Sequence, residues 1–350
     1  MAETTSLMLS LRYCLIYLLA LAGSVAAQVP QTDNEVPIQI NLKPDKNTIM
    51  LGEPLFLAFE VTNLSTEKLG LALGGDYRNQ FGRPDSFRVS VKSSDGTEVP
   101  HLQVLVSMGG LSGWEPIQAR ATYTVKLFML HWVTIDRVGT YRVNVRRMMN
   151  LANYEPTRST QRKYSFLANV DTEFTVVPYD EERMGAIINS LGSIMLNFAD
   201  PRAEESAQAL RAINDERVIS YFAEVVRKLN TSEVILGSTK SVLNRKAIVG
   251  LGRFDDDAAI DALQAAMTSR NQDTRLCIAH VFTDSLHRSA KSLLLKMYDD
   301  KDQAVRLTVA YGLARVKTNE ARAILHKLLN DEDEEVRQAA GGSLSQINKN

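Results

Sequence analysis

Two kinds of hydrophobic periodicity divide the chain. Between Val36 and Pro178, apolar and polar residues alternate in short runs that are separated by turn-forming residues. A period of two in segments rich in Val, Phe, Tyr and Thr is typical of half-buried strands. After Asp180 the apolar residues recur at helical spacing. We therefore predict a β domain over residues 36–179 and an α-helical domain over residues 180–350.

About seven short strands and no convincing helix are predicted in the first half, which favours an antiparallel β-sandwich. In the run FLAFEVTN, one alternate set is much more apolar than the other, so Leu57, Phe59 and Val61 should face the core. The clearest alternating runs are Pro37–Pro44, Glu53–Ser65, Asp85–Gly96, Ala121–Leu130, Gly139–Met148 and Asp171–Pro178.

Several of these runs resemble secreted immunoglobulin-like β-sandwiches, including those of the bacterial proteinase-inhibitor type. The resemblance rests on four segments: Gly52–Ser65, Asp85–Val99, the Gly109-Gly110-Leu111 loop, and Thr122–Val145. It implies a binding or spacer module. Inhibition of a proteinase would require a particular exposed loop, and the stretch from Met108 to Pro116 is the candidate for that alternative.

The second half contains an internal repeat with a period of about 31 residues. It predicts about four two-helix units, preceded by a helix near 183–198 and followed by a lone helix, 337–347. Such hairpins bury their apolar faces only by stacking, which predicts an α-solenoid. Apolar positions in register are Leu251, Phe282, Leu313 and Leu344; arginines in register are Arg275, Arg306 and Arg337. Asp302 and Asp333 precede helices whose free amides they can cap.

The repeat resembles the HEAT-like family of the phycobilisome-lyase type. The residues that carry the resemblance are Asp302–Asp333, Glu334–Leu344 and the weaker Thr274–Phe282, with a V-R-x-x-A pattern. It implies that Arg306 and Arg337 join acidic turn residues in a ladder along the stack, and that the second helices line a concave face. Lyase activity toward bilins is not implied.

The N-terminus predicts export. One basic residue, Arg12, precedes an apolar run of about ten residues and small residues that end at Ala27, which is the order of a secretory signal peptide. Residues 1–27 are the expected signal and 28–35 a linker; the alternative is an uncleaved anchor helix. Cleavage would leave no stable membrane span and only Cys277, which favours a bacterial periplasmic or extracellular protein without disulfides.

Composition excludes several classes of protein. The 350 residues include 40 basic and 41 acidic side chains, so the chain lacks the basic surplus of a nucleic-acid binder. Apolar residues at 45% and charged residues at 23% are typical of globular domains rather than disordered or multispan membrane chains. Composition therefore argues against a nucleic-acid partner, and the partner that we expect for the solenoid groove is a protein.

No pattern predicts catalysis, a cofactor or a metal. The five histidines, at positions 101, 131, 280, 287 and 326, form no ligand pair at helical spacing. Asp255-Asp256-Asp257 resembles the start of a calcium loop, but the following residues lack oxygen ligands, so we interpret it as a turn before a helix. Trp114 and Trp132 could form a carbohydrate platform, although we expect Trp132 in the core and Trp114 in a loop.

One surface hypothesis remains. Basic residues at equivalent positions of the last two second helices predict a basic stripe that could receive an acidic protein segment. The alternative is a solvated helix face without a partner. The stripe consists of Lys291, Lys296, Arg322, His326 and Lys327. The function expected from the sequence is a non-catalytic binding or scaffold protein; the alternatives are a proteinase inhibitor and an enzyme with an unrecognised site.

Overall fold

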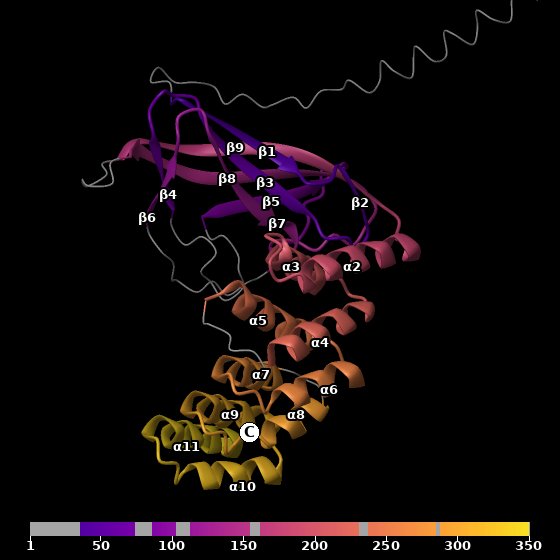
Figure 1. Cartoon of the computed structure of the whole chain (residues 1–350), viewed down its shortest axis with the longest axis vertical. Coiled ribbons are helices and arrows are strands. Elements are labelled where there is room, and N and C mark those ends of the chain that lie inside the picture. Colours follow the sequence, from indigo (N-terminus) through magenta and orange to yellow (C-terminus); the bar gives the residue numbers. More distant parts are fainter. Residues whose placement is uncertain are drawn as a thin grey trace, which may run out of the picture. The chain divides into compact units, whose positions relative to one another are not determined.

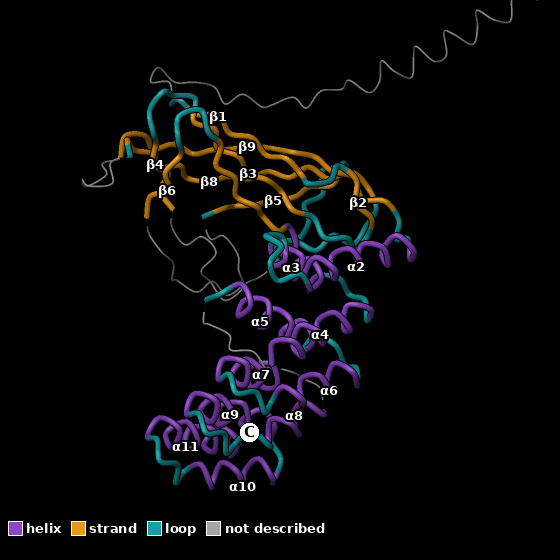
Figure 2. The backbone as a smooth tube through the Cα atoms, in the orientation of Figure 1, coloured by secondary structure: helices purple, strands orange, loops and turns teal. Residues whose placement is uncertain are grey.

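The computed structural model of the chain describes residues 36–73, 86–102, 113–154, 162–230, 237–284 and 288–349. Strands occupy the N-terminal part of these residues and helices the C-terminal part (Figures 1 and 2). The predicted order, a β region followed by an α region, is confirmed. The predicted signal peptide and linker, and residues 108–112 of the candidate inhibitory loop, lie outside the described residues.

The described strands form two sheets. A three-stranded sheet has the order β1-β3-β7, and a six-stranded sheet contains β2-β9-β8-β4-β6 with β5 also paired to β8. The pairs β1–β3, β3–β7, β4–β6, β4–β8 and β5–β8 are antiparallel. The strands are β1 (Ile38–Pro44), β2 (Thr48–Met50), β3 (Phe56–Asn63), β4 (Leu69–Leu73), β5 (Phe87–Ser93), β6 (Gly113–Ile117), β7 (Thr122–Phe128), β8 (Gly139–Asn153) and β9 (Arg162–Val177).

The alternation within β3 correctly predicted its buried face. Leu57, Phe59 and Val61 are fully buried. The Phe59 ring meets the Phe87 ring edge-on, with 5.0 Å between centroids. Because Phe59 belongs to the three-stranded sheet and Phe87 to the six-stranded sheet, apolar faces of the two sheets pack together.

Strand β6 was not predicted, and the expectation that Trp114 lies in a loop is wrong. Trp114 is opposite Ala72 in the antiparallel β4–β6 pair, and Pro116 is opposite Gly70. A strand was not predicted from the sequence because Gly113 and Pro116 are residue types that are typical of turns. Since β6 stands at the end of the strand order, a proline without an amide hydrogen is tolerated there.

The helical region begins with α2 (Glu181–Leu196) and ends with α11 (Glu334–Lys349). In the described ranges four helix pairs lie between them, and α11 starts one turn earlier than predicted. No helix in the described part of the chain has both the length and the apolarity required to cross a bilayer. The pairs are α3 (Ala203–Ala212) with α4 (Arg217–Asn230), α5 (Thr239–Leu251) with α6 (Asp257–Ala266), α7 (Gln272–Asp284) with α8 (Arg288–Leu295), and α9 (Gln303–Val316) with α10 (Asn319–Leu328).

The chain forms two compact units. The second unit contains the helices and also two segments that lie within the strand region of the sequence. Thr48–Leu55 and Ile135–Val138 group with the helices that follow Val176. Glu53, whose side chain is 1% exposed, accepts hydrogen bonds from Arg183 Nη2 of α2 at 2.9 Å and from the Met50 amide at 3.0 Å. An ion pair therefore ties the 48–55 segment to the first helix of the helical unit.

Candidate functional site

An arginine–aspartate ladder joins successive helix pairs at equivalent positions of the repeat. Arg275 Nε and Nη2 donate to the two carboxylate oxygens of Asp300, at 2.8 and 3.0 Å. Arg306 forms the same fork with Asp331, at 2.8 and 2.9 Å. All four side chains are exposed by 9% or less, so these are desolvated two-point ion pairs, the geometry that guanidinium forms best with a carboxylate.

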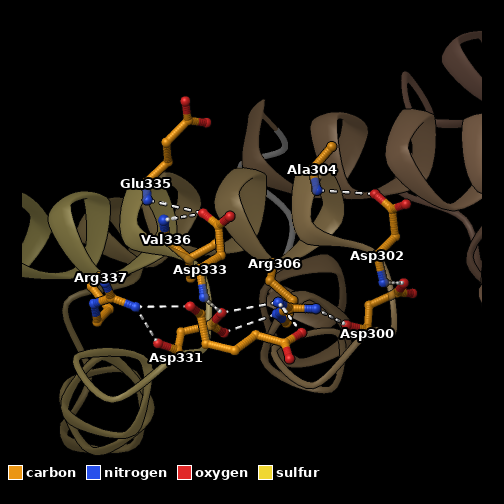
Figure 3. Close-up of polar contacts among 10 residues, drawn as sticks. Asp300, Asp302, Ala304, Arg306, Asp331, Asp333, Glu335, Val336 and Arg337 are labelled. Atoms are coloured by element: carbon orange, nitrogen blue, oxygen red, sulfur yellow. Dashed lines mark hydrogen bonds and ion pairs between the residues drawn. The ribbon is translucent and has the colours of Figure 1, made fainter.

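Each arginine of the ladder also donates to a main-chain carbonyl six residues earlier. The acceptors are the carbonyls of Ser269, Asp300 and Asp331, at distances of 2.8, 2.9 and 2.7 Å from Nη1. The resemblance implied acidic contacts for both Arg306 and Arg337. Arg306 binds Asp331 and Glu332, whereas Arg337 donates to the Asp331 and Glu332 carbonyls (Figure 3). The ladder therefore fixes the turn that precedes each first helix.

The same turns cap the first helices. Asp302 Oδ1 accepts from the Ala304 amide at 2.9 Å, and Asp333 Oδ1 accepts from the Glu335 and Val336 amides at 2.9 and 3.2 Å. Free amides at a helix start need such acceptors, and the positive end of the helix dipole favours a carboxylate there. Ladder and cap together hold each unit in register with the next.

The ladder ends where both of its partners change. One repeat earlier, Asn244 occupies the position of Arg275, and Ser269 occupies that of Asp300. Asn244 Nδ2 donates instead to Thr274 Oγ1 at 2.7 Å. The apolar repeat positions continue through this unit, since Leu251, Phe282, Leu313 and Leu344 are all buried. Apolar packing thus extends further along the helices than the ion-pair ladder does.

The predicted basic residues lie on α8 and α10 or directly after α8. Lys291 is half-buried, and Lys296, Arg322, His326 and Lys327 are exposed. Lys327 Nζ of α10 lies 5.1 Å from the centroid of the Tyr298 ring, two residues beyond Lys296, so the structure links the two successive units at this surface. Sequence reasoning missed Tyr298, because its repeat partners Met267 and Leu329 mark the position as apolar.

These five side chains, which we call the basic surface, make no ion pair or side-chain hydrogen bond with any residue that the structure describes. Other surface arginines of the helical unit do bind carboxylates. Arg202 pairs with Asp200, Arg227 with Glu224 and Arg315 with Asp284. The basic surface can therefore offer its charges to an external anionic group without first breaking an internal pair.

Two of the residues considered for ligand binding have structural roles. Asp256 caps α6 through the Ala258 and Ala259 amides, and Trp132 is fully buried, which excludes it from a carbohydrate platform. The thiol of Cys277 is free, and burial raises its pKa to about 11 despite nearby arginines. Across the described ranges, no three His, Cys, Asp or Glu residues group closely enough to hold a metal ion.

A family model of HEAT repeats matches residues 290–350, which include most of α8 and all of α9 to α11. No curated protein matches the sequence. Among solved structures, an engineered protein shares 19% identity, with a TM-score of 0.31, covering 48% of this chain and 81% of that one.

Two further solved structures show a similar level of likeness. A designed armadillo repeat protein in complex with the peptide (KR)4 shares 16% identity, with a TM-score of 0.31, covering 47% of this chain and 83% of that one. Human deoxyhypusine hydroxylase in complex with glycerol shares 14% identity, with a TM-score of 0.29, covering 47% of this chain and 75% of that one.

Proposed function

We propose that this chain is an exported, non-catalytic scaffold whose basic surface on α8 and α10 binds an acidic segment of a protein partner. The observation that carries the proposal is that five basic side chains on α8 and α10, or directly after α8, form no ion pair with a carboxylate in the described part of the chain. The HEAT-repeat match covers this surface, and stacked helical repeats commonly present extended surfaces to other proteins.

Lys327 combines its charge with an aromatic ring at this surface. Tyr298 supports Lys327 from the preceding unit, and its ring provides an apolar contact beside the positive charges. Exposed Arg322 and His326 lie on the same helix as Lys327. An acidic segment with an apolar side chain could contact both the positive charges and the Tyr298 ring. A helix face that only contacts solvent has no need of the aromatic ring.

The fold proposed for the scaffold has two parts. The helical unit is proposed as a HEAT-like α-solenoid, which the repeating ion-pair ladder and the buried repeat positions support. The β region is proposed as an immunoglobulin-like sandwich, which the antiparallel pairs and the Phe59–Phe87 contact support. In this proposal the sandwich serves as a spacer or a second binding surface.

Binding of a fluorescent ten-residue polyglutamate peptide tests the proposed surface. Reversing both charges, with Lys296→Glu and Lys327→Glu, should weaken binding at least about tenfold, which corresponds to about 1.4 kcal/mol. The control carries Lys240→Glu and Lys301→Glu, an equal charge change at exposed positions outside the basic surface. Equal affinity of the two double variants, with unchanged thermal melting, would refute the proposal.

The proposed export of the chain can be tested separately, through cleavage of the signal peptide. Expression of the full chain in a bacterial host should yield a protein whose N-terminus is Gln28, because the signal pattern ends at Ala27. Intact mass and N-terminal sequencing of the periplasmic fraction measure this. A chain that keeps residues 1–27 in the membrane fraction would support the anchor alternative instead.

A further inference from the structure

One face of the six-stranded sheet carries cations, apolar side chains and aromatic rings together. Along β8, the odd-numbered residues from Tyr141 to Leu151 are buried, whereas Arg142, Arg146 and Met148 are exposed. Successive side chains of a strand point to opposite faces, so the even-numbered residues of β8 share one face of the sheet. We call this face, opposite to the buried one, the outer face.

Two arginines are directly opposite each other on the outer face. Arg88 of β5 pairs with Arg146 of β8 in the antiparallel register, and both side chains are exposed. Side chains at such positions have Cβ atoms about 5 Å apart, and like charges there are destabilising. Arg146 forms no ion pair with any residue that the structure describes. An anionic group that binds both guanidinium groups would remove the repulsion between them.

Further along the same two strands, carboxylates accompany the cations. Lys92 is opposite Arg142 in the register of β5 and β8. Arg142 Nη2 lies 3.1 Å from Asp171 Oδ2 of β9, and Glu98 is opposite Lys92 in the turn that follows β5. The positive charge without a described carboxylate partner is therefore that of Arg146, at the other end of the pairing.

Two large apolar side chains are exposed on the outer face next to Arg146. Met148 and Leu167 are 55% and 52% exposed. Ser165 Oγ of β9 lies 3.9 Å from Met148 Sδ, so Ser165 projects from the outer face. Leu167 is two residues further along β9 and therefore projects from the same face. Apolar side chains that are grouped on an exposed face are typical of a surface that binds a partner or a membrane.

Two aromatic rings and a lysine extend the outer face across β4. Gly70 of β4 is opposite Ala152, an even-numbered residue of β8. A Cβ atom at Gly70 would lie 3.2 Å from Tyr154 Cδ2 and 3.4 Å from Trp114 Cε3, so both half-buried rings lie over this glycine on the outer face. Lys68 Nζ lies 4.7 Å from the centroid of the Tyr154 ring, which adds a positive charge beside the aromatic rings.

We infer that the outer face binds the surface of an anionic membrane. Basic side chains are attracted to anionic lipid headgroups, and Trp and Tyr rings favour the boundary between headgroups and acyl chains. An acidic peptide or polysaccharide would bind the charges, whereas a lipid surface also accommodates exposed Met148 and Leu167. The outer face belongs to the β unit, and its binding does not depend on the basic surface of α8 and α10.

Sedimentation with lipid vesicles tests the outer face. The chain used consists of residues 28–350, which removes the apolar N-terminal run and keeps every residue that the structure describes. It should bind vesicles of equal parts phosphatidylglycerol and phosphatidylcholine at least about tenfold more tightly than vesicles of phosphatidylcholine alone. Arg88→Glu combined with Arg146→Glu should remove that preference. Because the two opposite residues remain like-charged in this variant, its melting temperature should stay close to that of the wild type.

Two further double variants separate the contributions. Met148→Ser combined with Leu167→Ser should weaken binding to the anionic vesicles several-fold, because it removes the apolar contact and leaves the charges. Lys296→Glu combined with Lys327→Glu makes an equal charge change on the basic surface and should leave vesicle binding unchanged. Loss of vesicle binding in this last variant, together with full binding by the Arg88 and Arg146 variant, would overturn the inference.

Tryptophan fluorescence provides a readout that is specific to the outer face. The chain has two tryptophans, and Trp132 is fully buried. Anionic vesicles should therefore shift the emission of Trp114 to shorter wavelength, and Trp114→Phe should abolish the shift. Equal binding to both kinds of vesicle would refute the inference. Binding of polyglutamate that is lost on reversal of Arg88 and Arg146, without binding of vesicles, would assign the outer face to an acidic protein segment instead.

Discussion

Arg306 and Asp331 are 25 residues apart in sequence, yet their side chains form a two-point ion pair in which they are only 9% and 7% exposed. The pair connects the start of α9 to the turn before α11 and therefore spans one whole helical unit. Asp331 also accepts a hydrogen bond from the Asp333 amide through Oδ1, at 2.9 Å, so the same carboxylate orders the turn that caps the next helix.

Removing one partner of this pair should destabilise the helical unit strongly. Asp331→Ala leaves the Arg306 guanidinium buried without its main acceptor, and the expected loss is about 3 kcal/mol of unfolding free energy. The matched control is Asp284→Ala, which breaks an ion pair with Arg315 whose side chains are 75% and 64% exposed; its expected cost is below about 1 kcal/mol. Urea unfolding followed by circular dichroism measures both, and equal losses would contradict the structural role of the ladder.

The contribution of Asp331 to the free energy of unfolding should decrease as the pH falls. Hydrogen bonds from Arg306 hold the folded-state pKa of this carboxyl below its ordinary value, 3.8. Since the folded-state pKa is lowered, the stabilisation is complete above the unfolded-state pKa and is lost as pH falls toward the folded-state value. The stability difference between wild type and Asp331→Ala should therefore stay constant from pH 7 to about pH 5 and shrink below about pH 4. A difference that grows below pH 4 would contradict this linkage.

Close packing between α7 and α9 predicts that Gly312 does not tolerate a side chain. A Cβ atom at Gly312 would overlap Thr283 Oγ1 and lie 2.8 Å from Leu294 Cδ2. We expect Gly312→Ala to cost about 1 to 3 kcal/mol through overpacking. Gly342→Ala in α11 is the control, because no atom other than those of the neighbouring residues and the backbone of its own helix lies within 4 Å of its Cβ position, and alanine favours helix by up to about 1 kcal/mol. Stabilisation by both substitutions would disprove the close approach.

The ion pair between Glu53 and Arg183 predicts energetic coupling between the 48–55 segment and α2. Glu53→Gln removes a charge that is almost completely buried, and a loss of about 1 to 3 kcal/mol is expected. Arg183→Gln should cost a similar amount, and the double variant should lose less than the sum of the two. Circular dichroism at 222 nm, which reports the helices, measures all three unfolding transitions. If the losses of unfolding free energy in the two single variants add up to the loss in the double variant, Glu53 and Arg183 are not energetically coupled.

Some errors of prediction have identifiable physical causes. The strands β2, β4 and β6 were missed because they are short or contain turn residues, and their backbone hydrogen bonds come from distant partners such as β4 for β6.

Patterns in the amino-acid sequence were sufficient to determine the change from strands to helices, the buried face of β3, the period of the helical repeat and the caps formed by Asp302 and Asp333. Each of these depends on neighbours within one or two turns or along one strand. Tertiary structure alone decided which acidic turn residue forms the two-point pair with Arg306, that Glu53 joins the helical unit and that Trp114 lies in a strand. These outcomes depend on which distant segments pack together, because the partners that satisfy a buried charge or a strand edge come from elsewhere in the chain.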